Sequence, residues 1–287
     1  MKRKNKGSKT GLEGIRKLSE EMEERFSFFL REGRYKDVLL AMGNLSSYSL
    51  SNQLYILFQK GDATTVHGLK AWNRLGRRVR KGEKGIKIYQ PSRRKKEGEG
   101  EEETVRFKVG YVFDLSQTEG EEVRAFRFDE KALVKGKAKI LKGIKKAGES
   151  AGYCFEEAGE EELGEGCFGC CDHRERRIRI RERLGDVQEI STSVHECAHA
   201  LAHGHERKDF EGLAVLERRE IKEIEAESIA CIVCAYLGLD TEEFNFSYIA
   251  SWAKGDIVKF RKNLDVVSLY AKEIIKSIEE ETNESNE

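Results

Sequence analysis

The sequence predicts an α+β protein. We expect an N-terminal helical domain with a β-hairpin, and a C-terminal domain that combines a small sheet with long helices. Apolar residues recur at helical spacing in several stretches, and two of these are long, at about 186–204 and 217–237. Two alternating segments, 85–89 and 105–113, flank a polar stretch as hairpin strands do. The 287 residues are enough for two ordinary domains.

The N-terminal elements follow in order. Residues 1–11 are polar and basic, which predicts a disordered tail, and one domain is expected over 12–120. Between the hairpin strands, the sequence RRKKEGEGEEE predicts a long exposed loop. Residues 121–135 are expected to be a linker. Apolar periodicity predicts the helices of this domain near residues 12–29, 36–42, 49–59 and 68–76.

The second domain is expected to cover residues 136–280. It begins with a Lys-rich helix, continues with short strands and an acidic turn, and then contains the two long helices. Shorter helices are expected to fill the C-terminal region to about residue 279, followed by a frayed tail over 281–287. The first helix is predicted at 137–148 and the strands near 153–155, 167–172 and 176–181.

Composition describes a densely charged chain that can still bury a core. Hydrophobic residues make up 38% and charged residues 36%, with a formal net charge of zero. No apolar run approaches the ~20 residues that a membrane span requires. The basic start also lacks the apolar segment of a secretory signal. We therefore predict a cytoplasmic protein without a membrane partner.

Cysteine usage agrees with a reduced compartment. The chain has seven cysteines, an odd number that argues against a disulfide framework. The nearest approach to a cysteine motif is Cys167-Phe-Gly-Cys170-Cys171, which lacks a second CxxC partner. We favour small core-facing cysteines here over a structural zinc site.

The strongest motif is His195-Glu196-Cys-Ala-His199 on the first long helix. Two histidines four residues apart share one helix face, so both imidazoles can reach one tetrahedral zinc ion. Glu196 would lie beside the metal, where it can take a proton from an activated water and pass it to a leaving amine. The motif predicts a Zn²⁺ site with His195 and His199 as ligands and Glu196 as the catalytic base.

The third ligand has two candidate sources. His205 stands where the pattern HExxHxxGxxH places its third histidine, but Ala202 replaces the glycine that lets the chain turn back. The other source is a glutamate on the second long helix, where residues 220, 223 and 227 share one face and Glu225 points elsewhere. We favour Glu223. His203, one turn past His199, is a candidate for supporting the metal ligands or contacting substrate.

A basic segment dominates the first domain. Residues 70–96 hold twelve Lys or Arg and a single acid, Glu83, with aromatic residues interleaved. Basic grooves with stacking rings are typical of single-stranded DNA binding. A solvated hairpin with core aromatics is the alternative, and Trp72 in particular fits a core position. The candidate DNA-binding residues are Lys70, Arg74, Arg77, Arg78, Arg80, Lys81, Lys84, Lys87, Tyr55, Trp72 and Tyr89.

Two stretches resemble known families. The segment SVHECAHALAH, followed by EIEAESIACIVCAYLGLD, resembles the zincin-like domain of ImmA/IrrE-type metallopeptidases and of ArdC-type antirestriction proteins. This resemblance implies that Glu223 binds the metal and that Glu227 supports it. The stretch from SLSNQLYILFQK through RRVRKGEKGIKI to YVFDLSQTEG resembles the single-stranded DNA-binding domain of ArdC-type proteins over about 12–120.

Together these resemblances imply a protein that protects mobile-element DNA from restriction. The expected partners are single-stranded DNA and a peptide or protein substrate, and the expected domain is a zinc metallopeptidase. Two alternatives stay open: a regulatory zinc protease that cleaves a repressor or host protein, and a DNA-binding protein whose zinc site is not proteolytic. A transcription regulator that uses duplex DNA is a third hypothesis.

Overall fold

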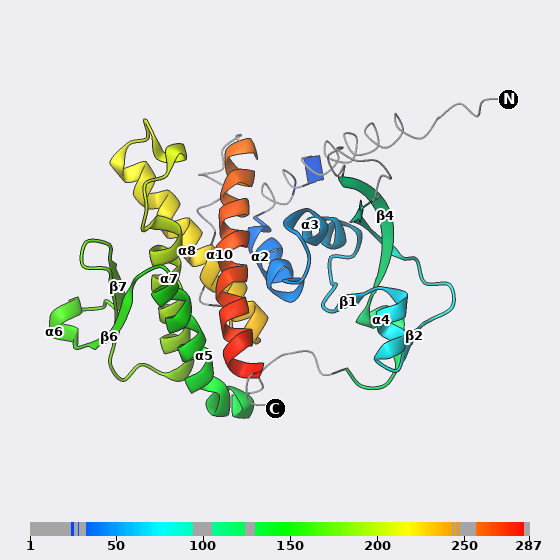
Figure 1. Cartoon of the computed structure of the whole chain (residues 1–287), viewed down its shortest axis with the longest axis horizontal. Coiled ribbons are helices and arrows are strands. Elements are labelled where there is room, and N and C mark those ends of the chain that lie inside the picture. Colours follow the sequence, from blue (N-terminus) through cyan, green and yellow to red (C-terminus); the bar gives the residue numbers. More distant parts are fainter. Residues whose placement is uncertain are drawn as a thin grey trace, which may run out of the picture. The chain divides into compact units, whose positions relative to one another are not determined.

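The computed structural model describes residues 24, 25, 28, 33–93, 105–123, 130–242, 244, 246 and 257–283 (Figure 1). It confirms the mixed α+β class, with small sheets and mostly helical structure. The predicted tail 1–11, the hairpin loop and most of the helix expected at 12–29 lie outside the described residues.

The chain divides into two compact units. One unit comprises the chain up to Val123 except for Met42–Ser46, and the other comprises Met42–Ser46 and the chain from Arg124 onward. We refer to them as the N-terminal and C-terminal units. No helix among the described residues is both long and apolar enough to cross a membrane.

Helices form one side of the N-terminal unit. Helix α2 (Tyr35–Asn44) runs into the C-terminal unit at its end, whereas α3 (Leu50–Gln59) and α4 (Leu69–Arg74) lie within the N-terminal unit. The Ser49 side chain caps α3 by accepting a hydrogen bond from Asn52 N. These three helices agree with the predicted segments.

Two small antiparallel sheets complete this unit. Strands β3 (Ile86–Arg93) and β4 (Val105–Asp114) form the predicted hairpin, and β1 (Val66–His67) pairs with the far edge of β4. Strands β2 (Arg77–Val79) and β5 (Thr118–Gly120) form the second sheet, after the 3₁₀ turn Leu115–Gln117. Neither short strand of the second sheet was predicted, because each holds only three residues.

Amide side chains of α3 cover the open edge of β3. Asn52 donates to Tyr89 O and accepts from Tyr89 N, both at 2.9 Å. Gln59 makes the same pair of bonds with Lys87, again at 2.9 Å. The edge strand is thus paired by side chains where a further strand would otherwise pair.

A three-stranded sheet opens the C-terminal unit after helix α5 (Glu130–Ser150). The strand order is β6-β8-β7, with β6 (Cys154–Ala158) parallel to β8 (Arg177–Arg181) and β7 (Gly169–Asp172) antiparallel to it. The predicted acidic turn contains a one-turn helix, α6 (Glu160–Leu163).

Long helices supply most of the C-terminal unit. Helix α7 (Asp186–His203) packs on α8 (Val215–Leu237), and α10 (Ile257–Asn283) packs on both α5 and α8 (Figure 1). A 3₁₀ turn at Lys208–Phe210 lies between α7 and α8. The interior consists of apolar residues from all four helices, including Ile144, Val194, Ile229 and Ile274.

Three boundaries differ from the prediction. Residues 130–135, expected in the linker 121–135, belong to α5. Over residues 257–283 the described C-terminal part forms a single helix of 27 residues, α10, where shorter helices were expected. This helix continues to Asn283, so the predicted frayed tail begins too early. Ion pairs from Lys142 and Lys146 to Glu281 hold the end of α10 against α5, which explains the extra turn.

Candidate functional site

Helix α7 places the two histidines of the motif side by side. His195 and His199 are one helical turn apart, so both imidazoles leave the same face. Their Nε2 atoms lie 3.1 Å apart, and their rings meet edge to face with centroids 4.8 Å apart. The neighbouring Val194 and Ala198 are fully buried, which fixes the rotation of α7 and therefore the direction of both rings.

Glu223 on α8 brings a third donor atom to this pair. Its Oε2 lies 3.7 Å from His195 Nε2 and 3.6 Å from His199 Nε2. Among the described residues, these three form the only group whose ligand atoms all lie within 4.8 Å of one another. A tetrahedral ion with bonds of 2.0–2.1 Å separates its donors by about 3.3 Å. The three side chains therefore fit a single four-coordinate ion.

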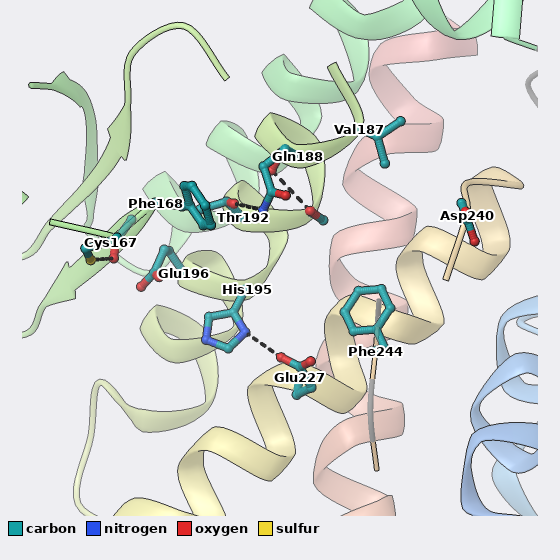
Figure 2. A pocket seen from close by; sticks show the side chains of 13 residues that line it. Cys167, Phe168, Val187, Gln188, Thr192, His195, Glu196, Glu227, Asp240 and Phe244 are labelled. Carbon is teal, nitrogen blue, oxygen red and sulfur yellow. Dashed lines mark hydrogen bonds and ion pairs between the residues drawn. The ribbon is translucent and has the colours of Figure 1, made fainter. Parts of the chain in front are cut away.

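The far nitrogen of each histidine has its own partner. Glu227 Oε2 lies 3.5 Å from His195 Nδ1 (Figure 2). Behind His199, the Nδ1 of His203 lies 3.0 Å from His199 Nδ1. Such partners fix the ring orientation and the tautomer of metal-binding histidines. The structure thus places both predicted supporting residues, Glu227 and His203, directly behind the ligand pair.

A buried ion pair lies behind His203 and extends this series of contacts. Its Nε2 lies 2.9 Å from Glu225 Oε2, and both side chains are completely buried. Arg207, from the loop after α7, donates to both oxygens of this carboxylate, at 2.5 and 3.1 Å. The prediction that Glu225 points away from the ligand face is correct, and its side chain instead anchors His203.

The proton positions in this series of hydrogen-bonded side chains, from His199 to Glu225, follow from the charges around it. Burial, with nearby cationic groups that include Arg207, lowers the pKa of His203 to about 2, so its ring is neutral. A neutral His203 with its proton on Nε2 donates to Glu225 and accepts from His199 Nδ1–H. In a neutral His199 with its proton on Nδ1, Nε2 is the nitrogen that can bind a metal ion.

The ligand group itself is strongly coupled. Burial lowers the pKa of His195, but hydrogen bonds to Glu223 and Glu227 outweigh it and raise that pKa to about 10. The same histidine and His199 hold the pKa of Glu223 far below its usual range. A divalent cation that bound these groups would displace the proton of His195.

Glu196 lies next to the ligands and is almost buried, at 8% exposure. Burial raises the pKa of its carboxyl group, against the opposing charges of His195 and His199. A glycine on β7 makes room for it, because a Cβ at Gly169 would lie 2.9 Å from Glu196 Cγ. The packing of β7 on α7 therefore positions Glu196.

The remaining metal candidates lie elsewhere. His205 is exposed beyond the end of α7, since Ala202 continues the helix, and it is not part of the three-residue group. Cys167, Cys170 and Cys171 are half-buried and free, so they face the core less than expected. They belong to no metal-binding group among the described residues. Cys197, Cys231 and Cys234 are the fully buried cysteines.

Three of the candidate DNA-binding residues serve the fold of the N-terminal unit. Trp72 is completely buried and donates from Nε1 to Phe113 O at 2.9 Å, so its assignment as a stacking residue is wrong. Arg77 donates to Thr118 Oγ1 at 2.8 Å and to the backbone of β5. Arg80 pairs with Glu83 at 3.0 Å and donates to Ser116 O. Both arginines thus tie the segment of β2 to residues 116–120.

The other basic candidates are exposed. They lie on α4, on β2 and along the turn into β3, and they are Lys70, Arg74, Arg78, Lys81, Lys84 and Lys87. Exposed lysines and arginines on one segment can neutralise several phosphates.

Aromatic residues gather on the outer face of the hairpin. We call this surface the hairpin face and define it by Lys87, Tyr89, Val109 and Tyr111, with Tyr55 of α3 beside it. Lys87 lies opposite Tyr111, and Tyr89 lies opposite Val109, so all four share one side of the sheet. Tyr111 is 56% exposed, and the rings of Tyr55 and Tyr89 are 5.1 Å apart.

Residues 17–128 match the family of N-terminal domains of the anti-restriction factor ArdC. The match includes the basic segment and both hairpin strands. The N-terminal part of the chain therefore matches an ArdC-type domain. An uncharacterized protein of Bacillus anthracis is 28% identical over 85% of this chain, and the chain spans 47% of that relative's length.

One solved ArdC structure shares the fold. The Mn(II)-bound crystal structure of the antirestriction ArdC protein from the R388 plasmid matches 90% of this chain and 97% of that one, with a TM-score of 0.55 and 18% identity. The metal-free structure of the same ArdC matches 79% of this chain and 84% of that one, with a TM-score of 0.48 and 20% identity. The predicted ArdC resemblance is confirmed, and the ImmA/IrrE likeness of the C-terminal half stays a prediction.

Sequence reasoning missed three residues of this candidate site. Gly169 belongs to a short strand, and only the packing of β7 on α7 gives it a role. Arg207 lies in a loop, and Glu225 contacts it only because that loop returns over α8. One signal was available: histidines 195, 199 and 203 recur every four residues, which places a third imidazole behind the second.

Proposed function

We propose that this chain is an antirestriction-type protein that binds single-stranded DNA and carries a zinc-dependent peptidase site. The observation that carries the proposal is the group of three donor atoms from His195, His199 and Glu223, with Glu196 beside it. A purely structural site has no use for a nearly buried carboxyl group next to its ligands.

Zinc is the ion that the donors favour. The three donor separations, 3.1, 3.6 and 3.7 Å, lie on both sides of the tetrahedral value of about 3.3 Å. Two imidazoles with one carboxylate are also a known donor set of catalytic zinc. The ArdC protein of plasmid R388 has a Mn(II)-bound structure, so manganese is the competitor that measurements have to exclude.

The proposed mechanism divides the chemistry among the side chains. A divalent ion at this site would polarise a peptide carbonyl and lower the pKa of a water molecule. Glu196 accepts the proton of that water and delivers it to the leaving amine. Glu227 and His203 keep the two imidazoles oriented, and Glu225, which Arg207 holds in place, accepts a hydrogen bond from Nε2 of His203.

The N-terminal unit supplies the proposed DNA binding. The ArdC family match covers it, and its hairpin face offers exposed rings next to a lysine. Bases of a single strand can stack on such rings, whereas paired bases cannot reach them. Lys81 and Lys84, in the turn that leads into β3, would contact phosphates.

Replacing Glu196 by Gln tests the peptidase half in the zinc-loaded full chain. The measurement is the protection of unmodified DNA entering a restricting host as a single strand. If proteolysis protects, Glu196→Gln lowers protection at least tenfold and leaves bound zinc unchanged. Glu220→Gln, an exposed carboxylate of α8, serves as the control. If Glu196→Gln protects fully and no uncut substrate accumulates in the host, the peptidase is rejected and a non-proteolytic zinc site is favoured.

Salt-dependent binding tests the DNA half. We expect the full chain to bind a single-stranded oligonucleotide more tightly than a duplex of the same sequence, with affinity falling steeply as salt rises. Equal or tighter binding to the duplex at every salt concentration would overturn this half and favour a transcription regulator.

A further inference from the structure

A cavity of about 630 Å³ opens beside the candidate metal site. His195 and Glu196 lie at one side of it, and the first two turns of α7 form its floor (Figure 2). The approach to β7 closes one flank, and the segment after α8 closes the other. The volume is in the usual range for ligand pockets, which hold a side chain or a small molecule.

Apolar side chains line the part of the cavity away from the donors. Phe168, before β7, and Val187, at the start of α7, are 44% and 39% exposed although both are large and apolar. Phe244 faces them from the opposite flank (Figure 2). Apolar groups that converge on one concave site indicate a matching apolar ligand, because burial removes them from water.

The polar groups of the floor are already used within α7. Gln188 Nε2 donates to Thr192 Oγ1 at 3.2 Å, and Ser191 Oγ donates to Gln188 O at 3.1 Å. They therefore form an uncharged floor. Asp240 at the rim also accepts a bond from Glu242 N at 2.8 Å.

The charges of the lining are all acidic. Glu196, Glu227 and Asp240 line the cavity, and none of its lining residues is a lysine or arginine. An acidic ligand side chain that extends past the metal ligands would meet Glu227 and Asp240, with no lysine or arginine in the lining to pair with. A small side chain would leave the apolar wall in contact with water.

We propose that this cavity receives a large uncharged apolar side chain of the polypeptide substrate, aromatic or long aliphatic. That side chain would lie next to the peptide bond to be cleaved at the metal site of His195, His199 and Glu223. The inference rests on the proposed peptidase function and names its substrate class. Phe168, Val187 and Phe244 determine the preference, while Glu227 and Asp240 exclude acidic side chains.

Amino-acid hydroxamates test the pocket by binding alone. A hydroxamate chelates the metal and holds its side chain nearby, so no turnover is required. The zinc-loaded full chain is titrated calorimetrically with N-acetyl hydroxamates of phenylalanine, leucine, glycine, lysine and aspartate. We expect phenylalanine and leucine to bind at least tenfold more tightly than glycine, which corresponds to about 1.4 kcal/mol. Aspartate is expected to bind more weakly than glycine.

A matched pair of variants locates the effect. Val187→Asp places a charge in the cavity, in the first turn of α7, where an acidic residue suits the helix dipole and leaves folding intact. It should remove the advantage of phenylalanine over glycine. Val215→Asp, at a valine 78% exposed in the first turn of α8, should retain that advantage.

The outcomes separate the pocket from the metal site. If no hydroxamate binds, glycine included, the metal site fails and the pocket inference fails with it. If all five bind equally, or if lysine or aspartate binds most tightly, the metal site stands and the apolar pocket is rejected. An unchanged preference in Val187→Asp also rejects it.

Discussion

Glu223 supplies the only oxygen of the donor triangle, and it comes from a different helix than the two nitrogens. Glu223→Ala should therefore lower zinc affinity by more than about a hundredfold, since loss of a ligand exceeds the 10–100-fold effect of a supporting residue. Metal content after dialysis and competition with a chelator measure this. His205→Ala should keep its zinc. Retention by Glu223→Ala, with loss in His205→Ala, would make His205 the third ligand.

Glu225 acts at one remove from the metal, through His203. Glu225→Gln removes one of the two carboxylates that pair with the buried Arg207, and Asp209 remains as the other. The free energy of unfolding should therefore fall by less than the roughly 3–5 kcal/mol of a fully broken buried pair. The substitution also loosens the hold on His203, so zinc affinity should fall about 10–100-fold. Chelator competition at a temperature where the variant is folded separates the two effects. Glu220→Gln, exposed on the same helix, is the control, and equal zinc affinity in both variants would contradict the role.

At the scale of single residues, the sequence predicted the three candidate ligands but not the Glu225–Arg207 pair that holds His203. His195, His199 and Glu223 follow from helical spacing and a known motif, which are local properties of the sequence. Glu225 and Arg207 meet because the loop after α7 returns over α8, and no local pattern encodes that path. The burial of Trp72 likewise depends on a carbonyl 41 residues away.

At the scale of elements, the contact of β7 with α7 positions the carboxyl group of Glu196, the proposed catalytic base. Gly169→Ala would place a Cβ 2.8 Å from Thr192 Cγ2 and 2.9 Å from Glu196 Cγ. We expect a loss of about 1–3 kcal/mol in the free energy of unfolding, measured with denaturant. At Gly61→Ala the new Cβ would meet only Leu57 O, at an ordinary 3.7 Å, and φ is not in the left-handed region, so this control should be close to neutral. Equal stability of both variants would show that β7 can shift to accommodate the added methyl group.

Elements were predictable where a single pattern extends over many residues. The hairpin β3–β4 and the helices α7 and α8 agree with their predicted segments, because alternation and helical periodicity continue along them. The strands β2 and β5 hold three residues each, too few for a pattern, and they exist because Arg77 ties one to the other. The length of α10 depends on its ion pairs with α5.

At the scale of the whole molecule, the two proposed activities reside in different units, so single substitutions should separate them. Tyr111→Ala removes an exposed ring of the hairpin face. Stacking contributes about 1–3 kcal/mol per base, so single-strand affinity should fall roughly five- to hundredfold. Zinc content should not change. Glu223→Ala should show the reverse, with zinc lost and single-strand affinity kept.

The control is Leu69→Ala, which removes a residue 51% exposed on α4, outside the hairpin face. Fluorescence anisotropy with a labelled oligonucleotide and metal analysis of the same samples give both readouts. If Tyr111→Ala and Leu69→Ala weaken binding equally, stacking on the hairpin face is not the source of affinity. If Glu223→Ala abolishes DNA binding while the chain stays folded, the two activities are not separable. Loss of the ion from the C-terminal unit would then change DNA binding by the N-terminal unit.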